Sequence, residues 1–360
     1  MLVCTRCNKK YPEEQVRYLC ECGEVLEVQR KIGKPKLKGI GLQRYKEVLP
    51  IDSELVTLNE GDTPLYRAEN TGRALGLSEL YLKFEGVNPT GSFKDRGSCV
   101  VITKALEHGF KATTVASTGN MAASVSAYSA KAELKCDVFV PQDTPQGKLA
   151  QVMAYNGNLI KVKGTFKDCV TKAKLHAHAG NYLAMTGLNP YFIEGEKTLG
   201  YELSGVEPDF IFMPLGTGGF MTAVWKAFKE QKKKTRMVGI QAVGCSPIVD
   251  AFEQGHDRPE HIEKANTIAS AILVKTPFNG HTAIRAMKES NGFGLKVNDF
   301  EILAAIKMLG KEGVFAEPAA ALPMSGLIKA LDQESVSRDE RIVLVITGHG
   351  LKDPSALGRA

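Results

Sequence analysis

Strand-like and helix-like segments alternate along the chain from about residue 60 onward. Strands are predicted at residues 80–84, 113–116, 137–140, 159–162, 210–213, 237–242 and 342–346, with helices after Lys94, after Asn120 and around residues 147–156. Alternation of this kind is typical of an α/β fold built on parallel sheets. Such sheets bind their ligands at the carboxyl ends of the strands. The functional residues are therefore expected in the loops that follow the strands.

The length and composition limit what this fold can be. A chain of 360 residues is long enough for two packed domains, each with its own core. The hydrophobic content of 43% and the charged content of 24% are ordinary for a globular protein, so we expect the chain to be folded throughout. The net charge of +6 is not gathered into one long basic block, which argues against nucleic acid as a partner.

The sequence also gives expectations about the compartment. No apolar run approaches the length of about 18 residues that spans a bilayer. The first residues, M-L-V-C-T-R-C-N-K-K, lack the basic-then-apolar order of a secretory signal. We therefore expect a cytoplasmic protein with no membrane partner. In a reducing cytosol, its eight cysteines are not expected to form a disulfide framework.

Four of these cysteines lie within the first 22 residues, as C-T-R-C at Cys4 and Cys7 and C-E-C at Cys20 and Cys22. Paired cysteines flanked by turn residues can place four thiolates around one point, which suits tetrahedral zinc. The second pair is C-x-C, tighter than the usual C-x2-C. The pattern predicts a zinc ribbon with a structural role, because four protein ligands leave no open position for catalysis. A vestigial ribbon with reduced, empty thiols is the alternative.

Three glycine-rich loops follow predicted strands, at residues 88–97, 116–121 and 214–220. The first, N-P-T-G-S-F-K-D-R-G, carries Lys94 in a turn. The third, P-L-G-T-G-G-F, precedes a predicted helix, so its backbone N–H groups can cradle a phosphate. Loops of this form also occur as plain strand-to-helix turns. The third loop lacks the P-loop and dinucleotide motifs, so nucleotide binding is not expected.

A phosphate cradle, a lysine in a turn and a Ser-Thr-Gly-Asn loop together suit a cofactor with a phosphate, an aldehyde and a ring hydroxyl. Pyridoxal 5'-phosphate (PLP) has all three groups. The sequence resembles the threonine synthase family, which has the tryptophan-synthase-β fold type, over about residues 55–355. The resemblance rests on motifs in the expected order: N-P-T-G-S-F-K-D-R-G, A-S-T-G-N, E-G-x-K-T at 194–198, A-E-P-A-A-A at 316–321 and T-G-H-G-L-K-D-P at 347–354. The cysteine-paired N-terminus is similar to that of some members.

The resemblance assigns the cofactor-binding residues. Lys94 matches the Schiff-base lysine, and Phe93 supplies part of an apolar setting that favours its neutral amine. Asn120 matches the residue that hydrogen-bonds the ring hydroxyl of PLP, and Thr347 matches the hydroxyl that faces the pyridine nitrogen. A neutral hydroxyl there favours elimination over transamination. The cofactor phosphate is assigned to Gly216, Thr217, Gly218 and Gly219.

Substrate-binding residues are assigned in the same way. Ser117, Thr118 and Gly119 match the loop that binds the substrate carboxylate in the family. This loop is expected to close on the substrate. An anionic leaving group could be held by Lys83, Ser92 and Arg96. Surface or carboxylate-pairing roles remain open for Lys83 and Arg96.

One motif departs from the family pattern. Threonine synthases hold the phosphate of O-phosphohomoserine with N-S-x-N-P-x-R, whereas this chain reads T-G-L-N-P-Y-F at residues 186–192. Phe192 therefore replaces an arginine, and an aromatic ring cannot replace bidentate phosphate recognition. We expect wild-type protein to be a poor threonine synthase or to prefer another substrate, and Phe192→Arg to improve the use of O-phosphohomoserine.

The resemblance also implies the domain organisation. The expected fold is PLP fold type II, tryptophan-synthase-β-like, with two parallel-sheet domains and a small N-terminal cysteine ribbon. The expected segments are a zinc-ribbon-like segment at 1–30, a linker at 31–52, a large PLP-binding domain at 53–96 and 191–360, and a smaller mobile domain at 97–190.

The leading functional hypothesis is a PLP-dependent lyase that converts O-phosphohomoserine and water to threonine and phosphate. The alternatives are β-replacement or β-elimination on an activated serine such as O-phosphoserine, as in cysteine- or cysteate-synthase-like enzymes, and a serine/threonine dehydratase. A silent family member acting as a binding protein is the non-enzymatic alternative, against which the intact Lys94, Asn120 and Thr347 argue. The expected partner is a small amino-acid substrate, and the expected assembly is a homodimer.

Overall fold

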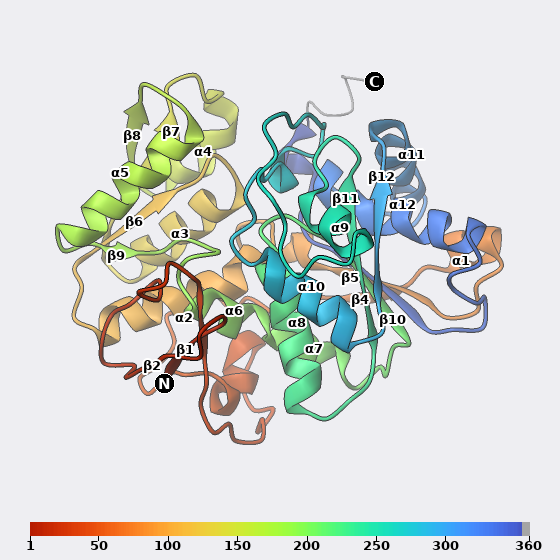
Figure 1. Cartoon of the computed structure of the whole chain (residues 1–360), viewed down its shortest axis with the longest axis horizontal. Helices are drawn as coiled ribbons and strands as arrows, with labels where there is room; N and C mark the ends of the chain where they lie inside the picture. Colours follow the sequence, from red (N-terminus) through yellow and green to blue (C-terminus); the bar gives the residue numbers. More distant parts are fainter. Residues whose placement is uncertain (355–360) are drawn as a thin grey trace. The chain divides into compact units, whose positions relative to one another are not determined.

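The computed structural model describes residues 1–354 and divides the chain into two compact units (Figure 1). Of the described residues, unit 1 comprises 1–62 and 88–198, and unit 2 comprises 63–87 and 199–354. The boundaries of these units differ from the predicted domain boundaries, because residues 53–62, 88–96 and 191–198 belong to unit 1. The predicted division into a large and a mobile domain stays a prediction.

Unit 1 is built on a four-stranded parallel sheet with the order β8-β7-β6-β9. Its elements in chain order are β1 (Leu2–Cys4), β2 (Lys10–Tyr11), β3 (Leu26–Val28), the 3-10 helix η1 (Gly41–Val48), α2 (Lys94–Glu107), β6 (Ala112–Ala116), α3 (Asn120–Lys131), β7 (Lys135–Pro141), α4 (Gln146–Ala154), β8 (Asn158–Val162), α5 (Phe166–His178), β9 (Tyr182–Leu183) and α6 (Tyr191–Glu196). Helices α3 and α5 pack on β6 and β7, and α2 packs on α3 and α6. The predicted strands and helices of this region are confirmed.

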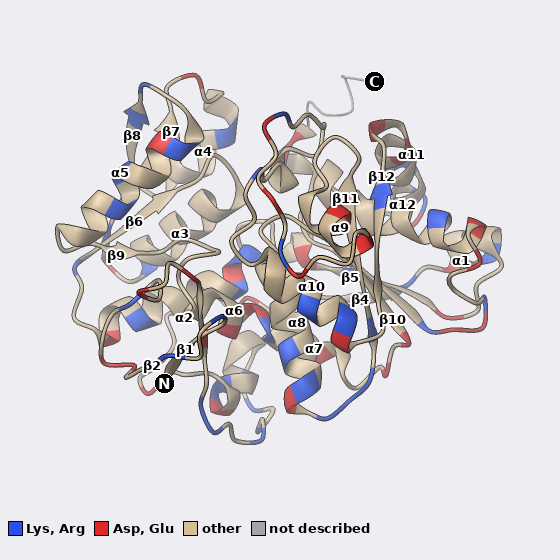
Figure 2. Cartoon of the chain, viewed as in Figure 1, with Lys and Arg blue, Asp and Glu red and all other residues tan. Residues whose placement is uncertain are grey.

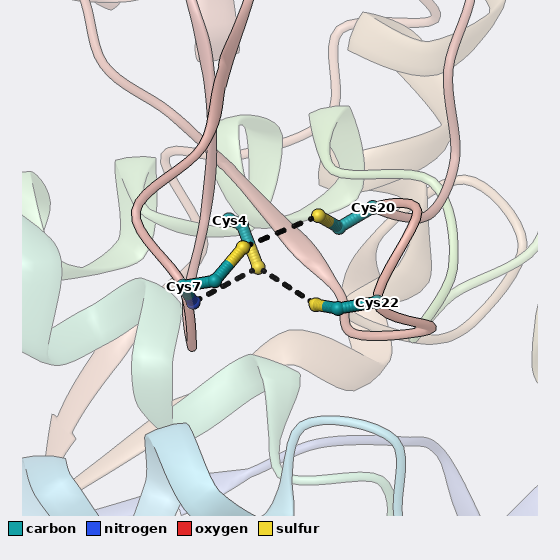
Figure 3. A group of neighbouring side chains, drawn as sticks. All are labelled: Cys4, Cys7, Cys20 and Cys22. Carbon is teal, nitrogen blue, oxygen red and sulfur yellow. Dashed lines mark hydrogen bonds between the residues drawn. The ribbon is translucent and has the colours of Figure 1, made fainter.

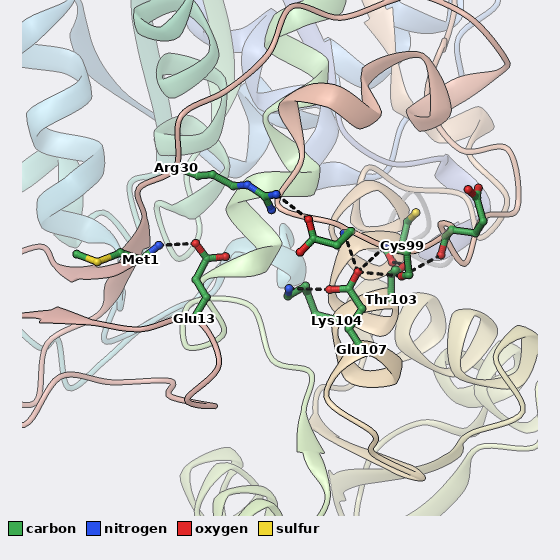
Figure 4. A network of polar contacts seen from close by, with 10 residues as sticks. Met1, Glu13, Arg30, Cys99, Thr103, Lys104 and Glu107 are labelled. Atoms are coloured by element: carbon green, nitrogen blue, oxygen red, sulfur yellow. Dashed lines mark hydrogen bonds and ion pairs between the residues drawn. The ribbon is translucent and has the colours of Figure 1, made fainter.

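The N-terminal segment forms a small antiparallel sheet with the order β2-β1-β3. Residues 31–52, predicted as a linker, contain η1, in which Leu42, Tyr45 and Val48 are buried. The segment is fastened to α2, because Glu107 accepts hydrogen bonds from the backbone N–H groups of Asp52 and Ser53, each at 2.8 Å (Figure 4). Part of the expected linker is therefore ordered structure.

Unit 2 is built on a six-stranded sheet with the order β12-β11-β10-β13-β5-β4, in which β4 alone is antiparallel to its neighbour. The helix α7 (Thr198–Leu203) begins at the boundary of the two units. The other elements are β4 (Leu65–Arg67), α1 (Glu69–Leu75), β5 (Leu80–Phe84), η2 (Glu85–Val87), β10 (Phe210–Pro214), α8 (Gly219–Glu230), β11 (Arg236–Ala242), α9 (Pro247–Glu253), η3 (Ser270–Ile272), α10 (Gly280–Glu289), β12 (Phe293–Val297), α11 (Asp299–Gly310), α12 (Pro318–Asp332), β13 (Ile342–Ile346) and η4 (Gly350–Lys352).

The central strands of unit 2 are apolar along their whole length. Strand β13 reads I-V-L-V-I and strand β10 reads F-I-F-M-P, and every residue of both is buried. A continuous apolar run is typical of a strand covered on both faces, because both sets of alternating side chains enter the core. The loops that follow these two strands carry the Gly216–Gly219 segment and Thr347. The buried sheet thus fixes the positions at which these two loops begin.

Lysine and arginine residues are interspersed with aspartate and glutamate residues over the elements of both units (Figure 2). The net charge of +6 is therefore spread along the chain. In residues 1–354, no helix combines the length and the apolar character that crossing a bilayer requires.

Candidate active site

Lys94 is the first residue of α2 and follows the tight turn at residues 88–93. Its Nζ atom lies 3.9 Å from the centroid of the Phe93 ring and 3.0 Å from Oε1 of Glu196. The side chain of Lys94 is 14% exposed and that of Glu196 is 1% exposed. The aromatic neighbour was predicted, whereas the carboxylate was not. Glu196 occupies the variable position of E-G-x-K-T, which gave no signal of a contact with Lys94.

The turn before Lys94 is fastened by Asp95. The backbone N–H and the hydroxyl of Thr90 donate hydrogen bonds to the Asp95 carboxyl group at 2.7 and 2.6 Å. Desolvation raises the pKa of Asp95 to about 6, although hydrogen bonds from Ser124 and Thr90 act in the opposite direction. Asn88 accepts a hydrogen bond from the N–H of Gly61 at 3.0 Å. The turn that presents Lys94 is therefore held at both of its ends.

Helix α6 approaches α2 closely because glycines stand at the contact. A Cβ atom on Gly97 would overlap the ring of Phe192, and one on Gly195 would overlap the backbone oxygen of Arg96. Phe192 is 1% exposed. Its ring thus lies in the packed contact between α6 and α2, and a phosphate-binding role for position 192 stays a prediction.

The Ser-Thr-Gly-Asn loop follows the carboxyl end of β6 and leads into α3, which begins at Asn120. Ser117, Thr118, Gly119 and Asn120 are all half-buried. The N–H of Gly119 donates to the Ser117 hydroxyl at 3.3 Å. No heavy atom outside the immediate chain neighbours lies within 4 Å of a Cβ placed on Gly119, so space is open beside this loop.

The Gly216–Gly219 loop of unit 2 joins β10 to α8. Gly218 has a φ of +92°, and a Cβ there would lie 2.5 Å from the backbone oxygen of Asn279, so this position requires glycine. The backbone oxygen of Thr217 accepts a hydrogen bond from the N–H of Asn279 at 2.9 Å. Because the first N–H groups of a helix have no partner within it, the start of α8 suits an anion such as a phosphate.

The predicted residue Thr347 follows β13 and is 3% exposed. The chain beyond it is held by a β-bridge between Ala316 and His349. The His349 ring lies between the rings of Phe84 and Phe315, with centroid distances of 5.9 and 5.7 Å. Thr347 thus lies directly after β13, in a segment held by a bridge and by aromatic contacts.

Two of the three residues proposed for an anionic leaving group have polar contacts within the fold. Lys83 pairs with Glu202 at 2.6 Å and donates to the backbone oxygen of Thr63 at 2.6 Å. Arg96 is fully buried and donates to the Thr198 hydroxyl at 3.1 Å. Ser92 is buried, and its hydroxyl has no hydrogen-bond partner among the described residues. Lys83 thus has the carboxylate partner that the sequence left open, and substrate roles for all three stay predictions.

The cysteines of the N-terminal segment form one cluster. The Sγ atoms of Cys4, Cys7, Cys20 and Cys22 all lie within 4.8 Å of one another, and the pairs Cys4–Cys22 and Cys7–Cys20 are each 3.5 Å apart (Figure 3). Tetrahedral zinc with Zn–S bonds of about 2.3 Å separates its sulfurs by about 3.8 Å. Desolvation acts to raise the pKa of the Cys20 thiol. Hydrogen bonds, above all the one with the Tyr11 hydroxyl, outweigh this effect and lower the pKa to about 6. The C-x-C spacing thus still permits a four-sulfur site.

Comparisons with known proteins agree with these observations. The model of a family described as pyridoxal-phosphate dependent enzyme matches residues 56–348. The threonine synthase of Methanocaldococcus jannaschii is 43% identical, covering 99% of this chain and 94% of its own. The threonine synthase of Methanosarcina acetivorans is 38% identical over 99% of this chain and 93% of its own.

Solved structures share the fold. The processed form of threonine deaminase isoform 2 from Solanum lycopersicum has a TM-score of 0.73 at 25% identity, covering 82% of this chain and 86% of its own. Maize serine racemase has a TM-score of 0.74 at 22% identity, covering 82% and 91%. The predicted fold class, PLP fold type II with α/β architecture and parallel sheets, is confirmed.

Proposed function

We propose that this chain, which belongs to the threonine synthase family of pyridoxal-phosphate dependent enzymes, converts O-phosphohomoserine and water to threonine and phosphate. The observation that carries the proposal is the position of Lys94. Lys94 is the first residue of α2 and directly follows the hydrogen-bonded turn. Its side chain is largely buried, with an aromatic ring and a carboxylate as its neighbours. A surface lysine would have no such setting.

The residues of each unit fit PLP by their chemistry. Lys94 offers an amine to the aldehyde, and Phe93 packs beside that amine. The Gly216–Gly219 loop offers backbone N–H groups to the phosphate, while Asn120 and Thr347 offer an amide and a hydroxyl to the ring. When bound, PLP supplies an electron sink for negative charge at the substrate carbons.

The protein groups then move protons and hold the substrate. Lys94 removes the α-proton of the amino acid, and its ammonium can return that proton later. The substrate carboxylate is assigned to Ser117, Thr118 and Gly119, beside which space is open. A second proton is then removed from the β-carbon, and phosphate leaves from the γ-carbon. A proton added at the γ-carbon and a hydroxyl from water added at the β-carbon complete the conversion.

A second candidate is replacement or elimination at the β-carbon of an activated serine such as O-phosphoserine. This candidate is favoured by the identity and surroundings of the residues expected to bind a phosphate on the substrate's γ-carbon. Phe192 stands in place of the arginine, Lys83 is paired with Glu202, and Arg96 is fully buried. An enzyme whose substrate carries no phosphate on its γ-carbon would not need a cation at position 192 or accessible charges on Lys83 and Arg96.

One assay separates the candidates. Protein loaded with PLP is incubated in parallel with O-phosphohomoserine, O-phosphoserine, O-acetylserine and threonine, each with and without sulfide or sulfite. Threonine and phosphate from the first substrate support the proposal. Turnover of the serine derivatives alone supports the second candidate, and 2-oxobutanoate from threonine identifies a dehydratase. A protein that binds no PLP, and so lacks absorbance near roughly 410 nm, would support a silent binding protein.

Three further assignments belong to the proposal. The four-cysteine cluster holds one structural zinc, because its sulfur separations and ligand set suit that ion. A cytoplasmic location is part of the proposal, and cysteines that form no disulfide in residues 1–354 are compatible with a reducing compartment. A homodimer is implied by the family resemblance alone.

A further inference from the structure

Asn279 lies 60 residues beyond the Gly216–Gly219 loop and contacts it through its backbone. Its N–H donates to the backbone oxygen of Thr217 at 2.9 Å. Its own backbone oxygen accepts hydrogen bonds from the hydroxyl of Thr282 at 2.8 Å and from the N–H of Ala283 at 3.0 Å. Asn279 precedes α10, so the start of α10 is tied to the loop before α8. The backbone of Asn279 is thus fixed on three sides.

The side chain of Asn279 points toward the start of α8. A Cβ placed on Gly219, the first residue of α8, would lie 3.3 Å from Oδ1 and 3.7 Å from Cγ of Asn279. The residue is 3% exposed, and Oδ1 has no hydrogen-bond partner among the described residues. Buried polar atoms are almost always hydrogen-bonded, so such an atom calls for a partner from outside the chain.

The neighbouring polar groups are paired with one another. The hydroxyls of Thr222 and Thr282 lie 2.7 Å apart, and the Thr222 hydroxyl is 3.1 Å from the backbone oxygen of Gly218. Asn279 carries no such contact at Oδ1. Its amide therefore differs from the surrounding hydroxyls, whose hydrogen bonds are made within the fold.

We propose that Asn279 is a further phosphate-binding residue, whose side-chain amide donates a hydrogen bond to a phosphate oxygen of PLP. The inference rests on the proposed function, because it takes the Gly216–Gly219 loop as the phosphate loop. A half-turn about the Cβ–Cγ bond exchanges Oδ1 and Nδ2, so the position of the unpaired oxygen is also a position for a donor. The amide adds a neutral donor to the helix N-terminus, which favours an anion.

The test compares PLP with pyridoxal, which has the same ring and aldehyde but no phosphate. Both are titrated into cofactor-free wild type, Asn279→Ala, Asn279→Asp and Asn279→Ser, and binding is followed by absorbance. Asn298→Ala is the matched control, because Asn298 caps α11 in the same unit. Thermal unfolding of each cofactor-free variant confirms that it is folded.

We expect Asn279→Ala to weaken PLP binding about ten- to a hundredfold, as for loss of a hydrogen bond to a charged group. Asn279→Asp loses more, because it sets a carboxylate against the phosphate. Asn279→Ser keeps a short donor and is expected to lose less, and it replaces Asn279→Ala if that variant does not fold. Pyridoxal affinity stays within about twofold of wild type in all of them.

Two outcomes overturn the inference but leave the proposed function intact. Unchanged PLP affinity in the Asn279 variants means that the amide does not contact the phosphate. Equal losses for PLP and pyridoxal mean that the substitution distorts the loop. A wild-type protein that binds neither compound overturns the proposed function and this inference together.

Discussion

The Nζ atom of Lys94 and the Oε1 atom of Glu196 lie 3.0 Å apart, although 102 residues separate them in the chain. Lys94 begins α2 and Glu196 ends α6. The pair exists because α6 packs on α2 where Gly97 leaves room for the ring of Phe192. The helix contact thus places a buried carboxylate beside the lysine on which the proposed chemistry depends.

This ion pair is expected to stabilise the cofactor-free protein. Glu196→Gln leaves a largely buried ammonium without its charged partner, and the free energy of unfolding is expected to fall by about 3 to 5 kcal/mol. Lys94→Ala combined with Glu196→Gln should cost less than the sum of the single changes. Denaturant unfolding of the four proteins measures the coupling, and strictly additive losses would show that the two groups do not interact in solution.

Lys94→Ala is expected to bind PLP through the phosphate loop but to form no covalent link and no product. Borohydride reduction followed by peptide mapping should label Lys94 in the wild type. Lys104→Ala is a suitable control, since Lys104 lies ten residues further along α2 and pairs with Glu107. A label on a lysine other than Lys94 would contradict the assignment of Lys94 as the Schiff-base lysine.

The packed position of Phe192 changes what Phe192→Arg is expected to do. A guanidinium at position 192 would place a charge in the buried contact with Gly97, where an uncharged ring now packs. We therefore expect Phe192→Arg to lower stability and not to improve the use of O-phosphohomoserine. Gly97→Ala should destabilise by about 1 to 3 kcal/mol, because its methyl group overlaps the same ring. Combining Gly97→Ala with Phe192→Leu should recover part of that loss. A stable Phe192→Arg enzyme with improved kcat/KM for O-phosphohomoserine would refute this reading of residue 192.

Asp95 gives a pH dependence of known sign. Its pKa rises from an ordinary 3.8 to about 6 in the folded protein, mainly through desolvation, so folding disfavours its ionised form. Its contribution to stability is therefore greatest below pH 3.8 and is lost as the pH rises to about 6. At about 1.36 kcal/mol per pKa unit, the loss is about 3 kcal/mol.

The measurement is the difference in unfolding free energy between wild type and Asp95→Asn across this pH range. That difference should fall as the pH rises. Asp168→Asn is the control, because hydrogen bonds from Thr165 lower the pKa of the exposed Asp168 carboxyl and the trend reverses. A difference for Asp95→Asn that grows with pH would contradict the burial argument.

The cysteine cluster is expected to hold about one zinc per chain in protein purified without added metal. Cys4→Ser with Cys7→Ser should release the metal and lower stability, while Cys245→Ser, outside the cluster, should keep it. Elemental analysis and thermal unfolding measure both effects. Turnover of folded, PLP-loaded protein should be unchanged in the double variant, and a large fall would show that the ribbon takes part in catalysis.

Local sequence was sufficient for the elements and for the motifs. The strands predicted at 80–84 and 342–346 have the observed bounds, because a short run of apolar and β-branched residues between polar turns favours a strand wherever it packs. The glycines of the 216–219 loop were identified from their spacing before a helix, and Gly218 takes the positive φ that such a turn requires.

Tertiary structure alone decided which distant groups meet. Glu196 beside Lys94, Asn279 against the Gly216–Gly219 loop and Glu202 paired with Lys83 all depend on how distant elements pack. Phe192 was judged from its motif position, yet its environment is set by a glycine in another helix. Sequence periodicity records which face of an element is apolar, whereas side-chain contacts between remote elements depend on crossing geometry and close packing, which no local pattern encodes.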